Sequence, residues 1–114
     1  GVLIEEAPMS KVEGPVVADL ESMIQFAGGG IVSKSIVESE RLGFMLFCME
    51  AGQQMSEHTA SVPAAIYVVR GAASVRLGDE THQARAGSFF YMPAQLPHAM
   101  VAEEDLVFLL VMAR

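Results

Sequence analysis

The stretch from Gly52 to Gly71 reads GQQMSEHTASVPAAIYVVRG, and the rest of the chain is organised around it. It begins with a glycine, reaches His58 after five further residues, continues as an apolar run and ends at a second glycine. A shorter stretch from Gly87 to His98, GSFFYMPAQLPH, echoes it with a glycine, an apolar run, two prolines and a histidine. Each histidine lies near a turn in a strand-rich segment, so we expect the two side chains to converge inside a barrel.

Short apolar segments separated by turn residues fill most of the remaining chain. Strands are expected at residues 31–37, 43–50, 64–69, 72–77, 81–85, 88–92, 100–102 and 106–112. Residues 78–80, Gly-Asp-Glu, read as a short hairpin turn between two of them. No segment has a convincing helical period beyond two turns, and residues 16–26 fit either a short strand or one helical turn. Many short strands at close spacing predict an all-β sandwich or barrel.

The run from Phe44 to Met49 is apolar at every position. Side chains alternate between the two faces of a strand, so both faces of this strand need cover. One face would be the lumen of a barrel. We expect the other to meet a second copy of the chain in a homodimer, or to be covered by the N-terminal arm, residues 1–15.

The stretch from Gly52 resembles the first of two motifs of the cupin superfamily. That motif reads Gly, five residues, His-x-His, three or four residues, Glu, six residues, Gly. Here Gly52, His58 and Gly71 match, whereas Ala60 stands at the second histidine and Ala64 at the glutamate.

The stretch from Gly87 resembles the second cupin motif, which reads Gly, five residues, Pro-x-Gly, two residues, His, three residues, Asn. Gly87, Pro93 and His98 match, whereas Gln95 replaces the motif glycine and Ala102 the asparagine. The resemblance implies an all-β, cupin-like double-stranded β-helix, or jelly-roll, barrel. We expect a single barrel domain at residues 16–114 that follows the arm.

The resemblance also implies a metal cage of three histidines and one glutamate, of which only His58 and His98 remain. These two are the candidate metal ligands, for a weakly bound divalent transition metal completed by water or by Glu57. Two other interpretations stay open for them. They are polar lumen residues that bond to water or to each other, or they are acid–base histidines that act without metal.

The lumen predicted from strand alternation is apolar with two polar anchors, which is typical of a small-molecule pocket. Its expected lining is His58, His98, Ala60, Ala64, Ile66, Val68 and Met100. The alternative is that these side chains simply fill a small barrel. Three functions follow: a small-molecule-binding sensor or accessory module, a metal-dependent enzyme of dioxygenase or isomerase type, or an assembly module without a ligand.

Composition excludes other classes of function. The net charge is −7, and the seven Lys and Arg residues form no run, so nucleic acid and anionic membrane surfaces are not expected partners. No apolar run is long enough to span a membrane, and no signal peptide is visible. The single Cys48 leaves no internal disulfide, so we expect a cytoplasmic protein.

Overall fold

A computed structural model describes residues 2–6 and 14–114, with side chains from Gly14 onward. Most of the predicted arm, residues 1–15, thus lies outside the described residues. What is described of it is mainly strand β1 (Val2–Glu6), which pairs in parallel with β2 (Gly30–Glu38). No helix among the described residues is long and apolar enough to cross a membrane.

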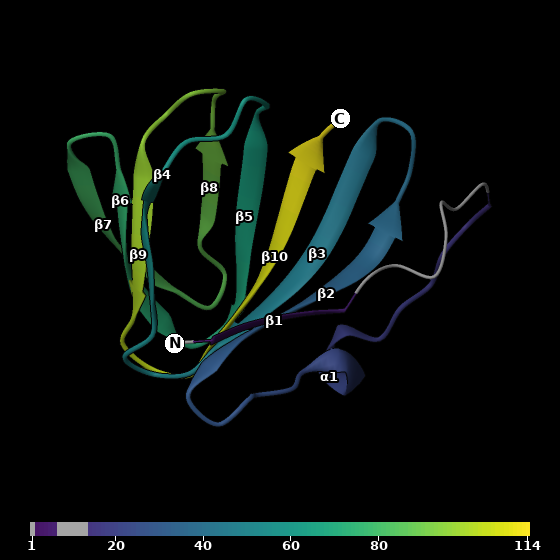
Figure 1. Ribbon diagram of the computed structural model, residues 1–114, viewed down its shortest axis with the longest axis horizontal. Helices are drawn as coiled ribbons and strands as arrows, with labels where there is room; N and C mark the ends of the chain where they lie inside the picture. Colours follow the sequence, from purple (N-terminus) through teal and green to yellow (C-terminus); the bar gives the residue numbers. More distant parts are fainter. Residues whose placement is uncertain (1, 7–13) are drawn as a thin grey trace.

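Two sheets face each other and form the barrel (Figure 1). In spatial order, the larger sheet contains β1, β2, β3 (Leu42–Met49), β10 (Leu106–Ala113), β5 (Ala64–Arg70) and β8 (Phe89–Met92). The smaller sheet contains β4 (Gln54–His58), β9 (His98–Ala102), β6 (Ala72–Leu77) and β7 (Glu80–Arg85). All pairings except β1–β2 are antiparallel. The predicted all-β barrel is confirmed.

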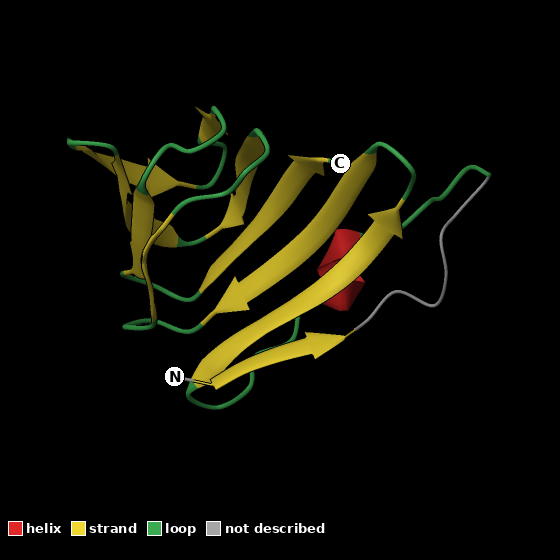
Figure 2. Ribbon diagram, turned by 45° about the horizontal axis from the view of Figure 1, so that its top comes forward, coloured by secondary structure: helices red, strands yellow, loops and turns green. Residues whose placement is uncertain are grey.

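The segment at residues 16–26 contains the helical turn that the sequence left open. Helix α1 (Leu20–Met23) has Asp19 as its N-cap, and the Asp19 carboxylate accepts a hydrogen bond from the Glu21 amide at 3.2 Å. An ion pair of 2.5 Å between Glu21 and Arg70 connects α1 to β5. The helix lies on the outer side of the larger sheet (Figure 2).

The core has two parts, separated by the larger sheet. The first fills the lumen, where the rings of Phe47 and Phe108 stack with centroids 5.0 Å apart. The second lies on the outer face, where Leu46 and Cys48 of β3 pack beneath a segment of the same chain. Strand alternation therefore gives β3 one buried face in each part, as its sequence predicts.

Part of that outer face is covered by a segment that follows the predicted arm. Three side chains at or just after the end of α1 pack against the group that contains Leu46 and Cys48. They are Met23, Ile24 and Phe26. The prediction that this face of β3 turns toward a partner is therefore wrong for these two side chains. Among the side chains that the structure describes, those of residues 23–27 cover them. The homodimer itself stays a prediction.

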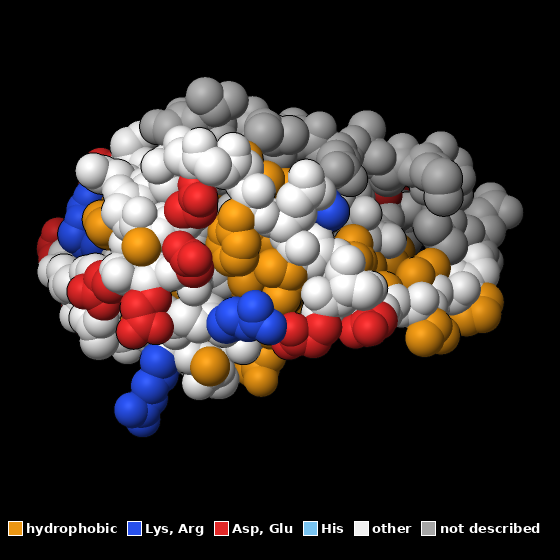
Figure 3. Space-filling model, turned by 90° about the horizontal axis from the view of Figure 1, so that it is seen from below, with side chains coloured by type: hydrophobic (Ala, Val, Ile, Leu, Met, Phe, Trp, Pro, Cys, Tyr) orange, Lys and Arg blue, Asp and Glu red, His pale blue; other side chains and the backbone are white. Residues whose placement is uncertain are grey.

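One face of the molecule carries side chains of both charges (Figure 3). On the face that Figure 3 shows, Lys and Arg side chains lie singly among acidic ones, with small hydrophobic groups between them. On this face the described side chains form no cluster of positive charge.

Candidate functional site

The two motif histidines lie side by side at one end of the lumen. His58 is the last residue of β4, His98 is the first of β9, and the two are direct cross-strand partners. Their ring centroids are 4.1 Å apart, with the ring planes inclined by 62°. The convergence expected from the glycine–histidine spacing is therefore present.

Both rings are oriented by the same local contact. Nδ1 of His58 lies 2.8 Å from the backbone oxygen of Ser56, and Nδ1 of His98 lies 2.9 Å from that of Leu96. A carbonyl oxygen only accepts hydrogen bonds, so Nδ1 must carry the proton and donate in each ring. In the neutral form, Nε2 of each ring is then a free acceptor. The pair thus offers two neighbouring lone pairs.

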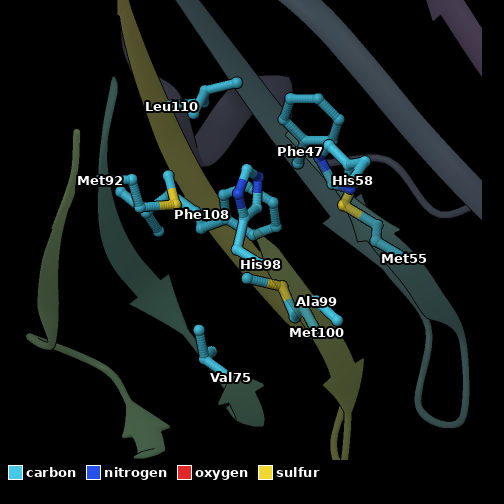
Figure 4. A pocket seen from close by; sticks show the side chains of 11 residues that line it. Phe47, Met55, His58, Val75, Met92, His98, Ala99, Met100, Phe108 and Leu110 are labelled. Atoms are coloured by element: carbon cyan, nitrogen blue, oxygen red, sulfur yellow. The ribbon is translucent and has the colours of Figure 1, made fainter. Parts of the chain in front are cut away.

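The rings border a small cavity between the sheets, of about 90 Å³ (Figure 4). Its walls are almost entirely apolar. They are formed by Phe47, Met55, His58, Ile66, Val75, Met92, His98, Ala99, Met100, Phe108 and Leu110. Pockets that enclose a drug-sized molecule measure roughly 300–1,000 Å³. The cavity therefore accommodates a few heavy atoms, or one end of a longer molecule.

The structure brings together only part of the predicted lining. Ile66 and Met100 line the cavity with the two histidines. Ala64 and Val68 are buried in the lumen core, on the same face of β5 as Ile66, but do not line the cavity. Ala60 lies in the β4–β5 loop, outside the lining, where its carbonyl accepts a hydrogen bond from the Gln95 amide at 2.7 Å.

Several lining residues were not anticipated from the sequence. Phe47 and Phe108 lie on directly paired strands, β3 and β10, and Leu110 continues the same face of β10. Their period-two spacing marks one face of each strand. The spacing does not reveal that this face lies opposite the histidines, because the alternation within one strand does not determine the order of the strands in the sheets.

The metal cage implied by the cupin resemblance does not fit these residues. Ala60 and Ala64 replace two ligands and carry no donor atom. Glu57, the suggested replacement, forms an ion pair of 2.8 Å with Arg76. Among residues 14–114, no three His, Cys, Asp or Glu side chains come together in a group that would hold a metal ion.

The third histidine and the cysteine lie elsewhere. His82, on β7, is exposed and lies 3.4 Å from the Glu80 carboxylate. Cys48 is buried on the outer side of the larger sheet, where desolvation raises the pKa of its thiol above 9.0. Neither side chain lines the cavity. Both residues can therefore serve as controls in experiments on the cavity.

Comparisons with known proteins agree with this architecture. The chain matches the family model described as "Cupin domain" over residues 45–112. A conserved protein of unknown function from Streptococcus pyogenes has 27% identity and a TM-score of 0.79, with 96% of each chain covered. KdgF from Halomonas sp. has 25% identity and a TM-score of 0.75, over 90% of this chain and 96% of that one.

A third similar structure shows the fold alone. It is a cupin superfamily protein from Desulfitobacterium hafniense, with 19% identity and a TM-score of 0.79, over 94% of this chain and 98% of that one. Among proteins of curated function, no sequence matches this chain significantly. The family match covers more than half of the 114 residues, and the chain belongs to the cupin family.

Proposed function

We propose that this cupin is a binding module that holds a small ligand at the paired imidazoles of His58 and His98. The observation that carries the proposal is the shared orientation of the two rings. Each Nδ1 is fixed by a backbone carbonyl, which leaves both Nε2 atoms free beside an apolar cavity. Prearranged polar atoms at the edge of an apolar cavity are typical of ligand sites.

The cavity sets the chemistry of the ligand. Two neutral Nε2 atoms accept hydrogen bonds, so they suit a hydroxyl or amine donor, and a protonated ring suits a carboxylate. The apolar walls favour a short hydrocarbon part. At about 90 Å³ the cavity holds this part only if it is a few atoms long. Short-chain alcohols and acids, or a longer ligand bound by one end, meet these conditions.

A metal-dependent dioxygenase or isomerase is less well supported by the side chains. The two imidazoles provide two protein ligands, whereas catalytic metal sites usually have three. Ala60 and Ala64 have no donor atom to offer, and Glu57 already pairs with Arg76. The free, buried Cys48 suits a reducing compartment, so a cytoplasmic location belongs to the proposal.

We also propose that the protein pairs with a second copy through the outer face of β5 and β8. Tyr67, Phe89 and Tyr91 are exposed there, and Tyr67 is the direct partner of Phe89 in the sheet. The chain carries a net charge of −7, so two copies repel each other unless they meet through an uncharged face. The three aromatic rings provide such a face, and a twofold axis would bring it against itself.

Titration by NMR tests the binding role. The full-length protein is titrated with acetate, propionate, propanol and phenol, and the ring nitrogens of all three histidines are followed. We expect Nε2 of His58 and His98 to shift with at least one probe, and His82 to stay unchanged. The H98A variant should remove the response and the matched H82A variant should keep it. A panel that leaves both cavity rings unaffected would contradict the proposal.

A further inference from the structure

Two methionine thioethers accompany the two imidazoles in the cavity. Met55 and Met100 are direct cross-strand partners on β4 and β9, as are His58 and His98. All four side chains line the same cavity (Figure 4). We call these four residues the His–Met cluster. It supplies two nitrogen and two sulfur donors from one pair of strands.

An irregularity in β4 produces this arrangement. Met55 and His58 are three residues apart, and in a regular strand their side chains would face opposite ways. The register of β4 against β9 shifts between them, so both side chains reach the lumen. The bulge thus places the Met55 thioether on the imidazole side, whereas regular alternation counted back from His58 would place Ser56 and Gln54 there.

We propose that the His–Met cluster binds a single monovalent copper ion, Cu(I). The inference rests on the proposed role of the paired imidazoles as a binding site and adds a metal ion as a second class of ligand for them. Thioether sulfur is a soft donor that selects Cu(I), and imidazole binds copper readily. The hard carboxylate donor of the usual cupin cage is absent at Ala64, so the donor set has changed from hard to soft.

The surroundings also favour a monovalent ion over a divalent one. The walls are apolar, and Glu57, the acidic residue nearest in sequence to His58, pairs with Arg76. The two fixed Nδ1–H groups hold both Nε2 atoms ready as ligands, as backbone carbonyls do for histidines in metal sites.

Anaerobic competition measures the predicted affinity. The protein, in a C48A background that removes the thiol, is titrated with Cu(I) in the presence of bicinchoninate. We expect one Cu(I) per chain. The double variant M55L/M100L keeps the volume of the side chains but removes both sulfur atoms, and we expect it to weaken Cu(I) binding about tenfold or more. The variant M45L/M112L is the matched control, because Met45 and Met112 pack against the lumen core without lining the cavity.

Zinc binding and X-ray absorption complete the test. We expect M55L/M100L to leave Zn²⁺ binding unchanged, and the copper edge of the loaded protein to show both sulfur and nitrogen neighbours. Equal Cu(I) affinity in the two double variants, or nitrogen and oxygen neighbours alone, would overturn the inference. If acetate or phenol shifts the histidine rings while Cu(I) does not bind, the copper site is wrong and the binding module stands. If neither binds, both are wrong.

Discussion

The two faces of the larger sheet bury apolar side chains in different ways. On the outer face, Leu46 and Cys48 are almost fully buried beneath residues 23–27 of the same chain. On the lumen face, Ile66 and Phe108 are nearly as well buried but border a cavity with two imidazoles. The outer group is built for packing alone. The lumen keeps a cavity beside polar atoms, as the proposed binding role requires.

Truncation should separate the two faces most clearly. Leu46→Ala is expected to lower the free energy of unfolding by about 4 kcal/mol, because the side chain is fully buried and its neighbours leave a cavity behind. Ile66→Ala should lower it by about 2 kcal/mol, because the side chain borders a cavity and so has fewer packing contacts to lose. Urea denaturation measures both. Equal losses would show that the lumen is packed as a core and not as a site.

The covering segment offers the next test. Phe26→Ala removes an apolar contact above the group around Leu46 and Cys48, and it should lower the free energy of unfolding by about 1–3 kcal/mol. It should also increase the rate at which Cys48 reacts with a thiol reagent such as Ellman's reagent. Val17→Ser is the control, because Val17 is fully exposed. An unreactive Cys48 in both variants would mean that Phe26 does not shield it.

The remaining outer face, around β5 and β8, tests the dimer. Tyr67→Ser with Tyr91→Ser should weaken self-association by a factor of about 30, equivalent to about 2 kcal/mol, if the exposed aromatic rings form the centre of the interface. Light scattering over a range of micromolar concentrations measures the mass. A monomer in the unsubstituted protein would rule out the dimer at this face.

Much of this organisation could be predicted from the sequence. The glycine–histidine spacing located both imidazoles, and alternation placed Ile66 and Met100 on the lumen side. The segment that covers the outer face of β3 could not be predicted. A helix of four residues is too short to show a hydrophobic period, and the local sequence around Met23 and Phe26 does not indicate which strand they contact. The cover is a long-range contact between the turn region and β3, and only the folded chain reveals it.

Position along the barrel was also beyond the local pattern. Ala64, Ile66 and Val68 share one face of β5, yet only Ile66 reaches the cavity. Alternation predicts which face a residue occupies but not its depth, which depends on how strands are staggered against one another. Met55 escaped prediction for a related reason, because the register shift in β4 reverses the face that simple counting gives.

The smallest expected effect concerns the Cys48 thiol on the outer face. Burial raises the pKa of this thiol in the folded protein above its ordinary value of 9.0. Between the unfolded and folded pKa values, the unfolded chain has lost the proton and the folded chain retains it, so the unfolded state binds fewer protons. The stability contributed by the neutral thiol is therefore fully present below about pH 9 and declines as the pH rises further.

Cys48→Ala should remove this decline. Urea denaturation from pH 7 to 10 measures the free energy of unfolding of both proteins, and the difference between them should change only above pH 9. A lumen substitution such as Met100→Leu should leave the decline in place, because Met100 lies on the opposite side of the sheet from the thiol.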